Sequence, residues 1–545
     1  MRRDMVRACL GLLLAVAVLV YVGCSSSSQP GASSPAPAAP AGEVKAAPRA
    51  AADKSAKLLA DWPKPQALLI ITGQMDGYLE PCGCTQGQQG GLIRRLDLVE
   101  RLKTQNYDFG LIDLGSLIKD PAAARGGFEQ AKIKFGIALK AYSTLKYDAI
   151  GLSAEDLKVG IGEAFAQFLN GLGDETKIVV ANVQPGAGFE SRIQPSQVIQ
   201  AGSAKIGVTS VIDPDALAQL SDPDKGDLLP TIKRPDEVLG QTLSELEGKS
   251  DHQVLMVQGP PDLAKRLATA YPGFEVVVAT SQFADPMDRE PLSLNGGKTL
   301  LVNVGRRGKY VGAVGFFPGD AEPVRFHLLA LGTRYDGPGT AVKKVIEDEY
   351  RSMLKAAGVV ENFPKHDFAG GASGATFVGA ETCKRCHPNT FMKWSTTKHS
   401  QAFTALVNDP KPNAIHDAEC ITCHTTGFEY TSGYRSEAAT PQLKGNQCEN
   451  CHGPGGKHVT DPDNLAFRAP MKISAEQADK NRLCLRCHDE DNDPNFDFAK
   501  YWGQVVHKGL DEYKDPKVHQ GITPKVARTA PRPKSDVSQG TDTRP

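Results

Sequence analysis

Four Cys-x-x-Cys-His motifs lie between Cys383 and His488, and they constrain this chain more than any other feature. Two cysteines three positions apart lie on one side of a helical turn, where both thiols can reach the same planar group. The spacing with a directly following histidine is typical of c-type haem attachment, and the histidine supplies an axial ligand to the iron. The motifs are Cys383, Cys386, His387; Cys420, Cys423, His424; Cys448, Cys451, His452; and Cys484, Cys487, His488.

Other uses of paired cysteines fit this pattern less well. A single Cys-x-x-Cys can be a redox dithiol or half of a zinc site, and several of them could form zinc ribbons or disulfides. A zinc site does not need a histidine directly after every second cysteine, however, and four repeats are not expected by chance. The sequence therefore predicts four covalent haem c groups, with thioether bonds at the eight cysteines and proximal iron ligands at the four histidines.

The composition around the motifs favours the same interpretation. Residues 376–515 contain few strand-like runs and many Cys, His, Asn, Pro and Gly residues, so they have little aliphatic material for a core of their own. Large apolar macrocycles would supply that missing core. We predict a mainly helical and irregular tetrahaem domain over 376–515, followed by a polar, Pro-rich, disordered tail over 516–545.

The first 24 residues have the pattern of an export signal. Arginines near the start precede an apolar run, Leu10 to Val22, which is short for a membrane span. The following Tyr21-Val22-Gly23-Cys24 resembles a bacterial lipoprotein box, which implies lipidation of Cys24 and anchoring on the periplasmic side of a membrane. Ser25 after the cysteine favours the outer membrane under the same resemblance. A plain signal peptide or an uncleaved anchor helix is the alternative.

Two further regions lie between the signal and the haem motifs. Residues 25–62 are rich in Ala, Pro and Ser, which predicts a disordered linker. Over residues 63–335, apolar strand-like runs such as ALLIIT, FGLIDLG and HQVLMVQ alternate with amphipathic stretches, which predicts an α/β domain. Residues 336–375 are expected to form a helix and a linker. The net charge of -1 gives no global field that would attract nucleic acid.

The C-terminal region resembles a known family of electron carriers. The segments FVGAETCKRCHPNTFMKWSTTKHSQAF, CITCHTTGF and GNQCENCHGPGGKHV are similar to the tetrahaem cytochromes that carry electrons away from hydroxylamine oxidation in nitrifiers. The resemblance covers about residues 376–488 and implies that His399 and His458 are distal iron ligands. His507 and His416 are further candidates from their positions. Members of this family can have one haem without a distal histidine, so both full and open coordination are compatible with the resemblance.

The region from about 67 to 331 resembles the metallophosphoesterase domain of periplasmic 5'-nucleotidases, in which Asp, His and Asn side chains hold two metal ions. In this chain the corresponding positions lack those ligands. We therefore expect an α/β metallophosphoesterase-like sandwich that has lost its catalytic metals. The replacements are Gln74-Met75-Asp76, Gly115-Ser116, Ser153-Ala154-Glu155-Asp156 and Ala279-Thr280-Ser281-Gln282.

One cysteine pair lies outside the haem motifs, at Cys82 and Cys84, after the first predicted strand. Two thiols separated by one residue could bind a soft metal or form a reducible disulfide, and a structural disulfide or an inert pair is the alternative.

The leading interpretation is a lipid-anchored periplasmic electron-transfer cytochrome. In this interpretation its α/β domain docks redox partner proteins or couples the chemistry of the Cys82 and Cys84 pair to the haems. No clear small-molecule substrate is indicated. The alternatives are a haem enzyme acting on nitrogen or sulfur compounds through one open haem, and an active phosphoesterase.

Overall fold

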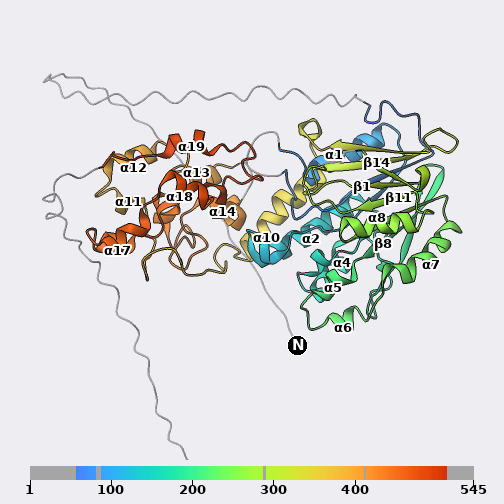
Figure 1. Ribbon diagram of the computed structural model, residues 1–545, viewed down its shortest axis with the longest axis horizontal. Helices are drawn as coiled ribbons and strands as arrows, with labels where there is room; N and C mark the ends of the chain where they lie inside the picture. The colour runs from blue at the N-terminus through green and yellow to red at the C-terminus, as the bar shows by residue number, and fades with distance from the viewer. Residues whose placement is uncertain (1–56, 82–87, 287–289, 410–412, 512–545) are drawn as a thin grey trace, which may run out of the picture. The chain divides into compact units, whose positions relative to one another are not determined.

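The computed structural model describes residues 57–81, 88–286, 290–409 and 413–511 (Figure 1). Cys24, Cys82 and Cys84 lie outside the described residues, so the predictions for them stay predictions. Within the described ranges, no helix is both long and apolar enough to cross a membrane. Residues 57–62, expected to end the linker, contact the folded body: Leu59 is buried and the Leu58 amide donates to Gln105 Oε1 over 3.1 Å.

The first sheet has seven strands in the order β15-β14-β1-β2-β3-β4-β6. Strand β1 pairs in parallel with β2 and antiparallel with β14, so that Ile70 lies opposite Leu111 and Ala313. From β1 through β6 all pairings are parallel. The strands are β1 (Ala67–Thr72), β2 (Phe109–Asp113), β3 (Ala149–Gly151), β4 (Lys177–Val179), β6 (Ile193–Gln194), β14 (Tyr310–Phe316) and β15 (Val324–Ala330).

The second sheet has six strands in the order β12-β13-β11-β10-β8-β7. Its centre is parallel, and its two edge strands pair antiparallel with their neighbours. The strands are β7 (Ser196–Ala201), β8 (Ala204–Ile212), β10 (His252–Gln258), β11 (Val276–Ala279), β12 (Leu292–Leu294) and β13 (Thr299–Val302). A separate short pair joins β5 (Val183–Gln184) to β9 (Thr231–Ile232).

The two sheets pack face to face, as the alternation of buried side chains shows. On β1, Leu69 and Ile71 belong to an apolar cluster that also contains Val254 and Met256 of β10. The intervening side chains of β1, such as Ile70, point to the other face and join a second cluster with the helices. Both faces of each sheet are therefore buried, as expected for a sandwich with helices on its outer sides.

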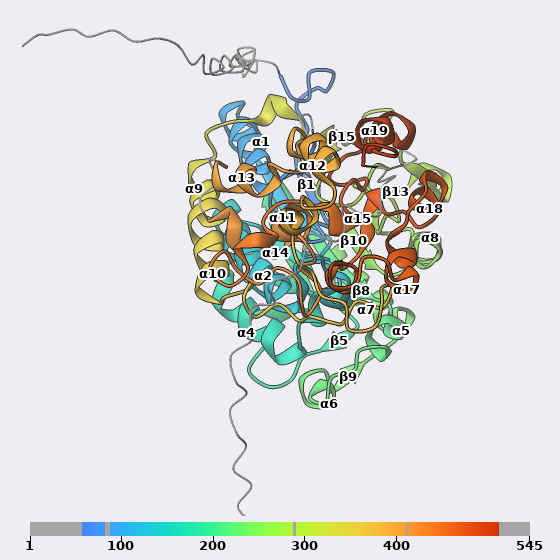
Figure 2. The ribbon, with the colours of Figure 1, turned by 90° about the vertical axis from the view of Figure 1, so that its left-hand side faces the viewer.

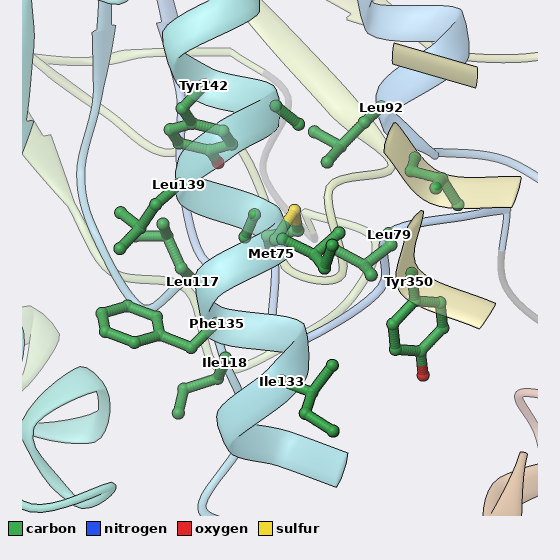
Figure 3. Close-up of a cluster of buried hydrophobic side chains, with 14 of the residues drawn as sticks. Met75, Leu79, Leu92, Leu117, Ile118, Ile133, Phe135, Leu139, Tyr142 and Tyr350 are labelled. Carbon is green, nitrogen blue, oxygen red and sulfur yellow. The ribbon is translucent and has the colours of Figure 1, made fainter. Parts of the chain in front are cut away.

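Helices cover both outer faces of the sandwich. On the outer face of the first sheet, α2 contributes Phe135, Leu139 and Tyr142 to a cluster with Met75 and Leu117 from the loops after the strands (Figure 3). The helices of the α/β region are α1 (Leu92–Thr104), α2 (Gly127–Leu145), α3 (Ala154–Leu157), α4 (Ile161–Gly171), α5 (Pro214–Ala218), α6 (Lys225–Leu228), α7 (Pro235–Glu247) and α8 (Pro261–Ala270). Helices α7 and α8 pack on the second sheet through their own apolar cluster.

The connection to the haem motifs begins as a helix. It consists of α9 (Thr340–Lys343), a π-helical segment (Lys344–Tyr350) and α10 (Arg351–Ala356). The residues after α10 run along the motif region: the His366 amide donates to the Glu429 carbonyl, and the Thr431 amide donates to the His366 carbonyl, both over 3.0 Å. This part of the expected linker is thus paired with the C-terminal region.

The C-terminal region consists of short helices joined by irregular segments (Figures 1 and 2). The helices are α11 (Ala380–Cys383), α12 (Pro388–Ser395), α13 (Ala402–Val407), α14 (Ala418–His424), α15 (Cys448–His452), α16 (Gly456–Thr460), α17 (Leu465–Arg468), α18 (Ala475–Lys480) and α19 (Phe498–Val505). The predicted fold class, an α/β sandwich followed by a mainly helical and irregular region, is confirmed.

Candidate functional site

Each Cys-x-x-Cys-His motif forms a single helical turn. The first begins at the end of α11, the second and third lie in α14 and α15, and the fourth forms a 3-10 turn. In the first motif the His387 amide donates to the Cys383 carbonyl over 2.9 Å, and in the fourth the His488 amide donates to the Cys484 carbonyl over 2.8 Å. None of the eight motif cysteines forms a disulfide. Every motif thus presents two thiols and one imidazole from one turn, as covalent haem attachment requires.

The motif histidines are oriented by hydrogen bonds through Nδ1. His424 Nδ1 donates to the Ala402 carbonyl over 2.5 Å, and His452 Nδ1 donates to the Met471 carbonyl over 2.6 Å. His488 Nδ1 lies 2.8 Å from Asp493 Oδ2. With Nδ1 engaged, Nε2 is the nitrogen left to bind a metal. Burial lowers the pKa of His424 and His452, which favours the neutral, metal-binding form.

Three of the motif histidines face a histidine from elsewhere in the chain. Two imidazoles that bind one metal ion from opposite sides, with bonds of about 2 Å, have ring centroids about 6 Å apart. The ring centroids in this structure are 6.4 Å apart for His387 and His458, 6.1 Å for His488 and His399, and 5.6 Å for His452 and His507. These three pairs therefore have the spacing expected of two axial ligands to one iron.

A buried nitrogen on one of the predicted distal ligands supports this fit. His458 Nδ1 is buried and has no hydrogen-bond partner among the described residues. Burial also lowers the pKa of His458 and of His399. His507 Nδ1 donates to the Val505 carbonyl over 3.0 Å, which leaves its Nε2 available. The residues present thus fit c-type haem with two histidine ligands at three motifs.

The fourth distal candidate, His416, is placed differently. Its Nδ1 lies 4.0 Å from Glu361 Oε1, and it sits in a 3-10 turn just before α14. In the described part of the chain, neither His416 nor any other histidine makes a ring contact with His424 of the second motif. The structure therefore brings together three of the four predicted distal histidines with motif histidines, and separates His416 from that arrangement.

Cysteines of different motifs lie next to one another. The Cys383 thiol of the first motif contacts the Cys448 thiol of the third, and this contact raises the pKa of Cys383. Cys423 of the second motif contacts Cys487 of the fourth in the same way. Helices α11 and α15, which carry the first and third motifs, are neighbours (Figure 2). Motifs one and three, and motifs two and four, are therefore adjacent in space.

The second motif is held by side chains that the sequence analysis did not identify. Asp417 caps α14 by accepting a hydrogen bond from the Glu419 amide over 3.0 Å. The Asp417 carboxylate is buried and also accepts from Arg351 Nη1 over 2.6 Å and from Gln130 Nε2 over 2.7 Å. An Asp directly before an amphipathic Cys-containing segment is a detectable N-cap signal, whereas its partners in α10 and α2 carry no local signal.

The third motif is tied to the first by a buried acid. Glu449 lies inside the third motif and is only 2 % exposed. Its carboxylate accepts hydrogen bonds from the Gly379 amide over 2.8 Å and the Gly455 amide over 2.7 Å. Because Gly379 directly precedes α11, this side chain fixes the third motif against the first. Nothing in the local sequence distinguishes Glu449 from an exposed acid.

The positions that resemble phosphoesterase ligands also meet in space. Gln74 Nε2 donates to the Ser281 carbonyl over 3.0 Å, and the Ser281 amide donates to Gln74 Oε1 over 2.5 Å. The Asp76 carboxylate accepts two hydrogen bonds from Arg306, each 2.8 Å long. Asp156 accepts from the Ser116 amide over 3.0 Å. Amides, a hydroxyl residue and a guanidinium thus occupy this edge of the sheets.

Asp76 and Asp156, two carboxyls at this edge, are buried. Burial raises the pKa of Asp76, although the Arg306 ion pair opposes this effect. Burial also raises the pKa of Asp156 to about 7, so it carries a proton during part of the time at neutral pH. Among the described residues, no group of three or more His, Cys, Asp or Glu side chains is arranged to hold a metal ion.

Comparison with known proteins identifies the C-terminal region. Residues 382–453 match the family model described as cytochrome c554 and c-prime, and residues 441–493 match a doubled CXXCH motif. The chain is 34% identical over 96 residues to cytochrome c-554 of Nitrosomonas europaea. That similarity covers 15% of this chain and 41% of the cytochrome. The predicted resemblance of the C-terminal third is confirmed.

The α/β region is similar in structure to phosphoesterases. A 5'-nucleotidase precursor from Thermus thermophilus is 19% identical with a TM-score of 0.44, over 60% of this chain and 66% of that one. The calcineurin-like phosphoesterase YfkN from Bacillus subtilis is 16% identical with a TM-score of 0.41, over 54% of this chain and 99% of that one.

Proposed function

Because the C-terminal part of this chain is a cytochrome c554-like multihaem domain, we propose that the protein is an electron-transfer protein with four covalent haem c groups. The main support for this proposal is the three histidine pairs, in which the ring centroids lie 5.6 to 6.4 Å apart. Redox proteins are the expected partners. The export signal and the lipoprotein box at Cys24 support a lipid-anchored position on the periplasmic side of a bacterial membrane, with the outer membrane favoured.

The residues that would hold the four groups have separate tasks. The motif thiols would form the thioether bonds, and the motif histidines would bind the iron through Nε2. His458, His399 and His507 would supply the second iron ligand at motifs one, four and three. Haem iron supplies one-electron chemistry, and two histidine ligands restrict it to electron transfer without substrate binding. The adjacency of motifs one and three, and of two and four, supports electron passage between them.

The second motif supports a second candidate function. His424 has its Nδ1 hydrogen bond to Ala402 but faces no histidine among the described residues. An iron bound there with one open axial position could bind a small nitrogen or sulfur compound, as in a haem oxidoreductase. The missing histidine partner of His424 in the described part of the chain favours this enzyme activity at motif two alone.

The haem content and the iron spin states test both functions. We expect the intact mass of the purified protein to show four covalent haems. Electron paramagnetic resonance of the oxidised protein should show three low-spin haems and one high-spin haem. Fewer than four attached haems would contradict the proposed cofactor content, and a spectrum with only low-spin iron would rule out the open site at His424.

We further propose that the α/β domain is not a hydrolase and serves to dock proteins. The ion pair between Asp76 and Arg306, together with the amide pairing of Gln74 and Ser281, supports this proposal. The protein supplied with Mn²⁺ or Zn²⁺ should therefore show no hydrolysis of nucleoside monophosphates above the buffer rate. Hydrolysis that disappears in an Asp76→Asn variant would contradict the proposal.

A further inference from the structure

The turn after the fourth haem motif contacts three separate segments of the α/β region. The Tyr78 hydroxyl, from the loop after β1, donates to Asp491 Oδ2 over 2.5 Å. Arg307, from the turn between β13 and β14, forms an ion pair with the same carboxylate. Arg125, which precedes α2, pairs with Asp489 over 2.5 Å. Acidic residues of the motif turn thus meet a tyrosine and two arginines of the α/β region.

Arg125 also reaches the attachment cysteines themselves. Its Nη1 lies 3.7 Å from Cys423 Sγ of the second motif, and its Nη2 donates to the Arg486 carbonyl within the fourth motif over 3.2 Å. The Arg125 side chain is 27% exposed. A side chain of the α/β region therefore places a permanent positive charge beside two haem motifs.

The charge at this position has a predictable effect on haem chemistry. Reduction of ferric haem adds one negative charge, so a nearby cation stabilises the reduced form and raises the reduction potential. Partial burial weakens the screening of that charge by water and salt. The negative charge of Asp489 opposes the effect of Arg125 on the potential. The Asp489 carboxylate also accepts hydrogen bonds from Asn492 Nδ2 over 2.7 Å and the Asn492 amide over 2.8 Å. The guanidinium is the group that contacts the cysteine sulfur.

We propose that Arg125 tunes the haems of the second and fourth motifs by raising their reduction potentials. This inference rests on the proposed function, since it requires haem at both motifs. The α/β domain then acts on the redox properties of a region to which it contributes no haem. Electrons are drawn toward the pair of motifs that lies against this domain.

Potentiometric titration of the full-length holoprotein, followed by visible absorption, tests the proposal. Arg125→Gln should lower the midpoint potentials of two of the four haems and leave the other two unchanged. Arg125→Lys, which keeps the charge, should lower them less. Asp489→Asn, which removes the opposing anion, should raise the same two potentials. Arg266→Gln, which breaks an exposed ion pair with Asp236 in the same domain, is the control and should change none.

The outcomes separate this proposal from the proposed function. The tuning role would be overturned if all four potentials were unchanged in Arg125→Gln. It would also be overturned if the potentials fell as far in Arg125→Lys as in Arg125→Gln. Shifts of the same sign in Arg125→Gln and Asp489→Asn would also overturn it, since they indicate a structural effect. Intact mass is measured first. A wild-type protein without haem at motif two or four would refute the proposed cofactor content and this inference together.

Discussion

The Arg351→Ala variant should be destabilised by about 3–5 kcal/mol relative to the wild-type protein. Arg351 is buried and pairs with Asp417 over 2.6 Å and with Glu80 over 2.8 Å. Its removal leaves the Asp417 carboxylate, which is 5% exposed, without its cation. The desolvation cost of that carboxylate then has no compensating ion pair. Chemical denaturation of the holoprotein, followed by far-ultraviolet circular dichroism, measures the loss.

The control is an arginine of α8 whose ion pair is exposed. Arg266 binds Asp236 through two hydrogen bonds, but both side chains are largely accessible to solvent. Arg266→Ala should therefore cost less than about 1 kcal/mol. Equal losses in the two variants would show that the buried pair does not stabilise the protein, and that the second motif is held by other contacts.

Replacing any one of His399, His458 and His507 with alanine should convert one haem from low spin to high spin. The ring centroid of each of these histidines lies 5.6 to 6.4 Å from that of a motif histidine, so under the proposed ligation its loss would remove one ligand from one iron. Electron paramagnetic resonance of the oxidised variants gives the number of high-spin haems. Each single variant should gain one relative to the wild-type protein.

His416→Ala is the control for these three variants. His416 contacts Glu361 and makes no ring contact with a motif histidine among the described residues. Its spectrum should therefore match that of the wild-type protein. If His416→Ala gained a high-spin haem, or if His458→Ala did not, the assignment of ligands to the three pairs would be refuted.

Local patterns in the sequence were sufficient for the elements whose cause is local. The motif cysteines identify haem attachment because thioether bonds require that spacing within one turn. The continuous apolar run of β1 predicts a strand buried on both faces, because neighbouring side chains point to opposite faces of a sheet. The distal candidates His399 and His458 followed from the resemblance to a family of similar sequence.

Pairings between distant residues could not be predicted in the same way. Which motif histidine each distal histidine faces depends on how α11, α15 and α19 pack, and no short pattern encodes that packing. Asp76 and Arg306 are far apart in the sequence, and they meet only because β1 and the turn before β14 lie side by side. Residues 336–375 are expected to form a helix and a linker, and no local pattern indicates that Val359 and Val360 within this segment are buried.

The contacts that hold the second motif in place have a consequence for how the protein is made. Gln130 and Arg351, which hold the cap of α14, precede Asp417 in the chain and are synthesised before it. Domains generally fold as units in the order of their synthesis. The side chains that hold the cap of α14 therefore belong to segments that are synthesised, and can fold, before motif two itself is made. Biogenesis of this one haem centre is thereby linked to the folding of a domain without haem, whereas Glu449 joins motifs one and three independently of it.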